Sequence, residues 1–143
     1  MGSDQLMSKY LPKAHHVLFT LVNAEGLDDA AYIIRGLKYT AVSIGAEVLH
    51  KHAHDFGDGL GVTAFLVLAE SHISIHTWPE HKRGFVDICT CGDSIDPMEA
   101  VGLMTWYFDA EAEEVTKIDR GTCVPDSPVV AYDLSENETC QKE

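Results

Sequence analysis

The chemically reactive side chains of this sequence concentrate in one segment, LVLAESHISIHTWPEHKRGFVDICTCG, residues 66–92. It contains Ser71, His76 and Cys91, and nucleophilic catalysis uses a hydroxyl, an imidazole and a thiol of this kind. Glu70 and Ser71 stand at the junction of two apolar stretches. The alternative is a tight turn between two strands, because small polar residues are common in such turns. The spacing alone leaves both interpretations open.

The run ESHISIHTWPE at residues 70–80, followed by CTCG at residues 89–92, resembles the defining segment of the short prokaryotic S-adenosylmethionine decarboxylases. Members of that family typically read E-S-H-[LI]-[ST]-I-H-T-W-P-E, with F-T-C-G a short distance further on. The resemblance extends over roughly residues 16–121, although only this segment is close. It implies a pyruvoyl-dependent decarboxylase, made as a single-domain precursor that cleaves itself into residues 1–70 and residues 71–143.

The resemblance also implies roles for individual residues. Ser71 would attack the carbonyl of Glu70 to form an ester. β-Elimination would free the first chain, and loss of ammonia would leave on the second a pyruvoyl group, which forms a Schiff base with the substrate. His76 would assist removal of the α-hydrogen of Ser71. Thr63, where the family usually has serine, would hydrogen-bond the shifting centre. Cys91 would return a proton to the substrate carbon after carbon dioxide leaves.

The alternation of a strand does not by itself bring these residues together. Ser71 has the same parity as Ile73 and Ile75. His76 has the opposite parity, so its side chain is expected on the other face of the strand. The chain must therefore twist or bulge for Ser71 to meet His76.

Two further residues are candidate substrate contacts by the same resemblance. Glu80 corresponds to a family carboxylate associated with the ribose of S-adenosylmethionine, and Phe56 to the aromatic residue that stacks on its adenine. A glutamate that merely lies in a surface turn is an equally open interpretation of Glu80. The loop FGDGLGVTA at residues 56–64 also departs from the family's F-x-P-x-G-V-S-G. It has one inserted residue and no proline, and Thr63 and Ala64 replace serine and glycine.

The leading prediction is therefore S-adenosylmethionine decarboxylation, which supplies the aminopropyl donor for spermidine. The resemblance implies a homodimer whose active sites draw on both protomers. The departures at residues 56–64 keep open a pyruvoyl-dependent decarboxylase of another amino acid, such as arginine or ornithine. A non-catalytic homologue that regulates an active subunit is a third interpretation, against which the intact Ser71, His76 and Cys91 argue.

The composition limits the class of partner. The 143 residues include 23 acidic and 10 basic side chains, which give a net charge of −13. Such a chain repels nucleic acid and anionic lipid and attracts cationic small molecules, although surface solvation explains the same charge equally well. No apolar run approaches the ~18 residues of a membrane span. The N-terminus lacks the pattern of a signal peptide, so we expect a cytoplasmic protein whose four cysteines are reduced.

A stripe of histidines is the other notable pattern. His50, His52 and His54 alternate in HKHAH, so on a strand they would share one face and form a candidate metal site. A solvated stripe is the more common arrangement, and no carboxylate lies at a suitable spacing. We therefore expect no metal.

Hydrophobic periodicity predicts the elements that position these residues. Strands are expected at residues 16–22, 46–54, 62–68, 71–78, 84–90 and 114–120, and helices at residues 31–44 and 98–112. This order predicts an α+β two-layer sandwich, in which two helices cover one face of a mainly antiparallel sheet. Residues 122–143 are polar and include two prolines, so we expect them to form a flexible tail.

Overall fold

The periodic segments of the chain form the expected elements in the expected order. The computed structural model describes residues 12–121. The strands are β1 (Ala14–Val22), β2 (Val48–Asp55), β3 (Val62–Leu68), β4 (Ser71–Trp78), β5 (Arg83–Cys91) and β6 (Glu111–Arg120). The helices are α2 (Ala30–Ser43), α3 (Glu99–Tyr107) and a short 3₁₀ helix, η1 (Pro79–His81).

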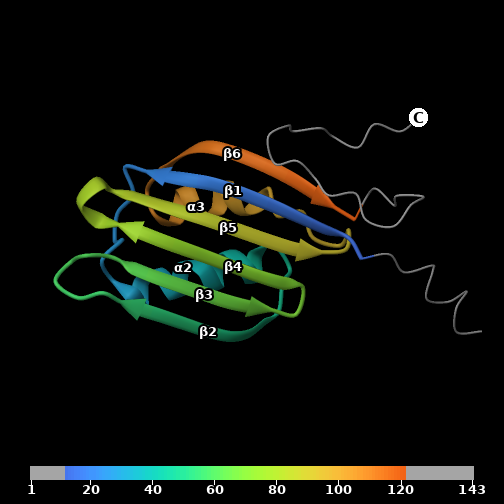
Figure 1. Cartoon of the computed structure of the whole chain (residues 1–143), viewed down its shortest axis with the longest axis horizontal. Helices are drawn as coiled ribbons and strands as arrows, with labels where there is room; N and C mark the ends of the chain where they lie inside the picture. Colours follow the sequence, from blue (N-terminus) through green and yellow to red (C-terminus); the bar gives the residue numbers. More distant parts are fainter. Residues whose placement is uncertain (1–11, 122–143) are drawn as a thin grey trace, which may run out of the picture.

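The six strands form one sheet in the order β2-β3-β4-β5-β1-β6. Every neighbouring pair is antiparallel. Figure 1 shows α2 and α3 on the same side of the sheet, and within residues 12–121 no helix covers the other side. The prediction of an α+β two-layer sandwich, with two helices on one face of an antiparallel sheet, is confirmed.

The two faces of the sheet differ in burial. The face under the helices carries the core: Ile73 and Ile75 of β4 are fully buried there, and the helical layer contributes Leu37 and Phe108. The opposite face, which we call the open face, mixes polar side chains with large apolar ones that are 36–47% exposed. These apolar residues are Leu18, Phe65, Val67, Phe85 and Ile118. An apolar surface of this kind commonly marks an interface.

Helix α2 begins at a side-chain cap and ends at a glycine. A carboxylate oxygen of Asp29 accepts a hydrogen bond from the backbone N–H of Tyr32 at 3.0 Å, which satisfies one of the free N–H groups of the first turn. Gly45, with φ of +89°, lies just beyond the last turn, where a left-handed residue commonly ends a helix. The predicted helix, residues 31–44, differs from the observed one by one residue at each end.

Helix α3 is shorter than predicted. It spans Glu99–Tyr107 rather than residues 98–112, and β6 begins at Glu111 rather than at residue 114. The chain turns at Asp109, which has φ of +48°, a conformation that Asp tolerates. Glu111 then pairs with Val22 of β1. Strand pairing therefore outweighs the helix propensity of residues 110–112.

Two predictions concern membranes and the C-terminal tail. No helix within residues 12–121 is long and apolar enough to cross a membrane. The predicted tail, residues 122–143, lies outside the described residues.

Candidate active site

The bond between Glu70 and Ser71 lies in the turn from β3 to β4. Ser71 has φ of +147°, a backbone conformation that side-chain-bearing residues rarely adopt and that costs about 1–3 kcal/mol. A carboxylate oxygen of Glu70 accepts a hydrogen bond from the backbone N–H of Glu47 at 3.1 Å, which helps to fix the turn. The peptide bond at which cleavage is predicted is therefore held next to a strained residue.

The carbonyl oxygen of Glu70 has a hydrogen-bond donor on the adjacent strand. The backbone N–H of Cys91, the last residue of β5, donates to it with an N···O distance of 2.7 Å. The register of β4 with β5 pairs Ser71 with Thr90, which places Cys91 beside this carbonyl. A donor in that position stabilises negative charge that develops on the oxygen when a nucleophile attacks the carbonyl carbon.

The hydroxyl of Ser71 contacts His72. Its Oγ lies 3.3 Å from Nδ1 of His72, and Nε2 of the same imidazole lies 3.3 Å from Oδ2 of Asp87 on β5. Strict alternation would direct Ser71 to the helix-covered face together with Ile73. The unusual φ of Ser71 breaks that alternation and brings the hydroxyl to the imidazole of the next residue.

His76 and Thr63 form a separate pair at the opposite end of the sheet. They face each other across β3 and β4, with Oγ1 of Thr63 3.1 Å from Nδ1 of His76. Ser71 and His76 are five positions apart on one strand, which is about 17 Å at a rise of ~3.3 Å per residue. Within one protomer, the structure does not bring His76 to Ser71.

The two candidate substrate contacts also lie at the His76 end. Phe56 directly follows β2; its side chain is 57% exposed and packs edge-on against the ring of His54, with 4.7 Å between the ring centres. Glu80 belongs to η1, directly after β4. This end of the sheet therefore carries an exposed aromatic ring and a carboxylate, while Ser71 lies at the other end.

The two cysteines of β5 differ in environment. Cys91 is exposed and Cys89 is buried. Sγ of Cys89 lies 3.4 Å from Nε2 of His16 on β1, and Nδ1 of His16 lies 4.0 Å from Oδ1 of Asp87. Of the two thiols, that of Cys91 is the one that a substrate can reach.

His72, Asp87 and His16 belong to a network that the sequence analysis missed. One of these residues could have been noticed in the sequence. Asp87 is a carboxylate inside an otherwise apolar strand, and it is expected on the same face of that strand as Cys91. The other members depend on register, which pairs His72 with Cys89, and Cys89 in turn with His16. Such cross-strand neighbours are not evident before the order of the strands is known.

A second group of polar residues surrounds His15 of β1. Its Nδ1 lies 2.6 Å from Oδ1 of Asp119 on β6, and its Nε2 lies 2.9 Å from Oδ1 of Asp93 in the loop after β5. These two hydrogen bonds raise the pKa of His15 above its ordinary 6.5. The bond to His15 in turn lowers the pKa of each carboxyl below 3.8. The bridge ties the loop that follows Cys91 to the edge of the sheet.

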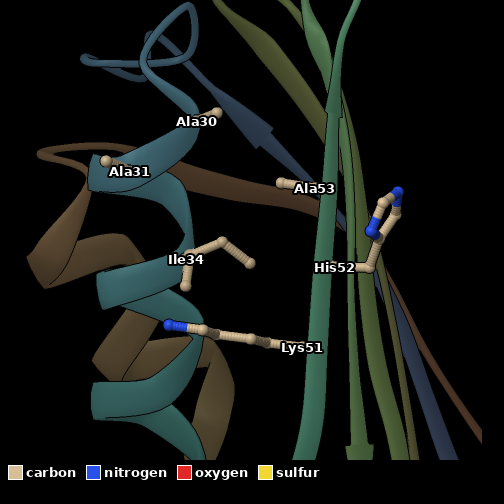
Figure 2. A pocket seen from close by; sticks show the side chains of 6 residues that line it. All are labelled: Ala30, Ala31, Ile34, Lys51, His52 and Ala53. Atoms are coloured by element: carbon tan, nitrogen blue, oxygen red, sulfur yellow. The ribbon is translucent and has the colours of Figure 1, made fainter.

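The groove beside α2 and the histidine stripe of β2 contain none of the predicted catalytic residues. A groove of about 320 Å³ lies between α2 and β2. Figure 2 shows Ile34 and Ala53 on its two walls, while His52 points to the other side of β2. The histidine stripe is solvent-exposed at all three positions, His50, His52 and His54. Within residues 12–121, no three His, Cys, Asp or Glu side chains are arranged to hold a metal ion.

Comparison with known proteins gives one consistent result. The family model described as S-adenosylmethionine decarboxylase matches residues 15–121. The S-adenosylmethionine decarboxylase proenzyme of Clostridium kluyveri is 36% identical over 108 residues, which cover 74% of this chain and 85% of that protein. The corresponding proenzyme of Pyrobaculum aerophilum is 49% identical over 94 residues, 66% of this chain and 75% of that protein.

A solved structure agrees with the sequence matches. The crystal structure of the adenosylmethionine decarboxylase from Aquifex aeolicus matches with a TM-score of 0.67 and 25% identity, over 85% of this chain and 100% of that chain. Fold, sequence and the segment around Ser71 thus agree, and the chain belongs to the S-adenosylmethionine decarboxylase family.

Proposed function

We propose that this chain is the precursor of a pyruvoyl-dependent S-adenosylmethionine decarboxylase. It cleaves its own backbone into residues 1–70 and residues 71–143, and the processed enzyme releases carbon dioxide from S-adenosylmethionine. The product is the aminopropyl donor for spermidine. One observation carries the proposal: in a chain of this family, the bond between Glu70 and Ser71 adjoins a strained residue, and its carbonyl oxygen accepts the backbone N–H of Cys91.

The geometry of the turn supports self-cleavage. Oγ of Ser71 attacks the carbonyl carbon of Glu70, and the N–H of Cys91 stabilises the negative charge that develops on the oxygen. Conversion of the amide to an ester frees the backbone of Ser71 from its strained conformation. His76, hydrogen-bonded to Thr63, then assists removal of the α-hydrogen of Ser71, and β-elimination separates the two chains. Hydrolysis of the new N-terminus by water then releases ammonia and leaves the pyruvoyl group.

A pyruvoyl group derived from Ser71 fits the start of β4. It would begin the second chain beside the last residue of β5, whose backbone N–H already points at the junction. When present, the group draws electrons from the α-carbon of the substrate as carbon dioxide leaves. Cys91, whose thiol is exposed next to this position, then returns a proton to that carbon.

A second copy of the chain completes the site. Ser71 and His76 lie about 17 Å apart along one strand, so a single protomer does not unite them. The half-exposed apolar side chains of the open face support an interface there. Two copies packed through their open faces about a two-fold axis, with their β4 strands antiparallel, would bring the Ser71 end of each protomer to the His76 end of the other. The proposed assembly is a homodimer with two composite sites.

The same arrangement accounts for the substrate contacts. Phe56 and Glu80 lie at the His76 end, so in the homodimer they would come from the protomer that supplies His76. The exposed ring of Phe56 would stack on adenine, and the carboxylate of Glu80 would accept hydrogen bonds from the ribose hydroxyls. The net charge of −13 favours a cationic sulfonium substrate.

Cleavage is tested by an intact-mass spectrum of the denatured protein. We expect two chains, residues 1–70 and residues 71–143, with the second blocked to Edman sequencing. Ser71→Ala should remain whole, because it has no hydroxyl to attack Glu70. A wild-type protein that remains a single chain after prolonged incubation would remove the proposal.

The substrate is tested by carbon dioxide release from S-adenosylmethionine, arginine, ornithine and lysine in parallel. We expect S-adenosylmethionine to be the best substrate. Glu80→Gln should raise its KM roughly 10- to 100-fold, because a hydrogen bond to a charged group contributes ~1.5–3 kcal/mol. Activity on arginine or ornithine with none on S-adenosylmethionine would contradict the assignment of substrate and leave self-cleavage intact.

A further inference from the structure

The proposed cleavage needs a base for the hydroxyl proton of Ser71; His76 acts later, on the α-hydrogen, and the imidazole that contacts this hydroxyl is that of His72. Resting on the proposed function, we propose that His72 is this base and that Asp87 is the positioning residue that orients it. The three side chains form a continuous line on the open face, from Ser71 through His72 to Asp87.

The contacts place the two ring nitrogens in different roles. Nδ1 of His72 lies 3.3 Å from Oγ of Ser71, and Nε2 lies 3.3 Å from Oδ2 of Asp87. A carboxylate can only accept a hydrogen bond, so Nε2 carries the hydrogen in this contact. In the neutral imidazole, Nδ1 is then left as an acceptor that faces the hydroxyl of Ser71.

The surroundings hold the imidazole in place. The ring of Phe65 on β3 stacks on that of His72, with 5.3 Å between centres and 16° between planes. Oδ1 of Asp87 is buried and has no hydrogen-bond partner within residues 12–121, while its Oδ2 faces His72. The side chain of His72 is 27% exposed. The imidazole is therefore restrained on three sides: by Phe65, by Asp87 and by Ser71.

The step balances within the chain. As Oγ of Ser71 bonds to the carbonyl carbon of Glu70, the hydroxyl proton moves to Nδ1 of His72, and the carboxylate of Asp87 stabilises the imidazolium. Negative charge on the Glu70 oxygen is stabilised by the N–H of Cys91. The C–N bond then breaks, and the same proton passes from His72 to the departing nitrogen of Ser71. The product is an ester with a free amino group, and no other reactant is needed.

The test compares the rate of chain cleavage in newly synthesised His72→Gln precursor with that of wild type. General-base catalysis contributes about 10²- to 10⁴-fold, so we expect cleavage to slow by at least about a hundredfold. His52→Gln is the matched control: the same substitution at an exposed histidine of the sheet that Figure 2 shows pointing away from α2. The control should cleave at the wild-type rate.

Hydroxylamine separates this role from that of His76. The base proposed here acts before the ester exists, so hydroxylamine should release no chains from His72→Gln. His76→Ala should stall after the ester forms, and hydroxylamine should then cleave it. Cleavage of His72→Gln at the wild-type rate, or accumulation in it of an ester that hydroxylamine cleaves, would overturn the proposal for His72.

Asp87 provides a second, independent test if His72→Gln fails to fold. Asp87→Asn should slow cleavage about tenfold, because an amide can also donate to Nε2 and so favour the tautomer with hydrogen on Nδ1. Asp87→Glu keeps the carboxylate and should cleave faster than Asp87→Asn. Equal rates for the two variants would overturn the positioning role. A wild-type chain that never cleaves would instead refute the proposed function itself.

Discussion

Two groups of the same residue, Cys91, act at different stages of the proposed reaction. Its backbone N–H bonds the carbonyl oxygen of Glu70 at 2.7 Å and acts while the chain is still whole. Its thiol is exposed and would act only later, on the substrate carbon. Because a change of side chain leaves the backbone N–H in place, substitution at this residue separates self-cleavage from decarboxylation.

We expect Cys91→Ala to cleave at least in part but to decarboxylate poorly. Loss of a general acid typically lowers the rate about 10²- to 10⁴-fold, whereas the oxyanion donor of the cleavage step is unchanged. Intact mass reports the cleavage, and carbon dioxide release from the cleaved fraction reports the turnover. Turnover at the wild-type rate would reassign the acid, with Cys89 as the next candidate.

The sequence singled out Ser71, His76 and Cys91 as candidates for chemistry, but it did not show which side chains of this segment touch. Strand parity required a twist or bulge for Ser71 to meet His76; Ser71 does have an unusual φ of +147°, but within one protomer its hydroxyl contacts His72 and not His76. Parity gives a face and no contact distance, however, so it did not indicate that the hydroxyl of Ser71 lies 3.3 Å from Nδ1 of His72 while His76 pairs with Thr63. The donor to the Glu70 carbonyl is a backbone group, which a search for reactive side chains does not consider.

At the scale of the elements, helices α2 and α3 pack closely where α2 has a glycine. A Cβ added at Gly36 would lie 2.5 Å from Cε1 of Tyr107 and 3.0 Å from Cζ of Phe108. The ring of Tyr107 cannot easily yield, because its hydroxyl donates to the carbonyl of Tyr32 at 3.0 Å. The hydroxyl of Tyr32 donates in return to the carbonyl of Tyr107 at 2.7 Å.

We therefore expect Gly36→Ala to destabilise the fold. Overpacking costs about 1–3 kcal/mol, which exceeds the ~1 kcal/mol that alanine adds in helix propensity. Gly102→Ala in α3 is the matched control: an added Cβ meets nothing within 4 Å there, so stability should rise by about 0.5–1 kcal/mol. Urea unfolding in a Ser71→Ala background, which stays whole, measures both changes. A Gly36→Ala protein as stable as Gly102→Ala would contradict the packing argument.

The bridge around His15 joins three elements and makes their association depend on pH. The raised pKa of His15 means that its stabilisation is complete below pH 6.5 and is lost as pH rises through the raised value. The lowered pKa values of Asp93 and Asp119 mean that their stabilisation is present above pH 3.8 and is lost as pH falls through the lowered values. The bridge is therefore strongest between pH 3.8 and pH 6.5.

We expect the difference in Tm between wild type and His15→Gln to be largest in that window and to shrink on either side of it. Lys13 and Lys117 lie near the same carboxylates, so they remain as partners in the variant. Thermal unfolding in a series of buffers, again in the uncleaved Ser71→Ala background, measures the difference. A difference in Tm that is constant from pH 4 to pH 9 would show that protonation of His15 is not involved.

The sequence predicted the elements well where periodicity was strong. Strands β1 to β5 and helix α2 agree within about two residues at each end, because their apolar positions repeat at strand or helix spacing over the whole element. The predicted end of α3 was wrong, because Glu111 and Ala112 have helix propensity but pair with Val22 and Leu21 of β1. A local sequence pattern does not indicate which strand a segment will pair with.

At the scale of the whole molecule, the sheet of one protomer keeps apart the residues that the proposed reaction would bring together. Ser71, Cys91 and the scissile carbonyl lie at one end of the open face, and Thr63 and His76 lie at the other. The order of the strands follows from long-range pairing, which the sequence analysis did not attempt to predict. If two copies pack through their open faces about a two-fold axis, the Ser71 end of each protomer meets the His76 end of the other. This packing leads to a prediction that differs from that of any arrangement within one protomer.

Co-expression of Ser71→Ala and His76→Ala chains tests whether each site draws on two protomers. Each variant alone should fail to complete cleavage, because one lacks the nucleophile and the other lacks the processing histidine. In a mixed dimer, the Ser71 of the His76→Ala chain would meet the intact His76 of its partner, so that chain alone should be cleaved. Different affinity tags on the two chains allow the mixed dimer to be isolated, and intact mass then shows which chain is cut. If Ser71 and His76 acted within one protomer, neither chain could complete cleavage, and a mixed dimer with both chains whole would contradict the composite site.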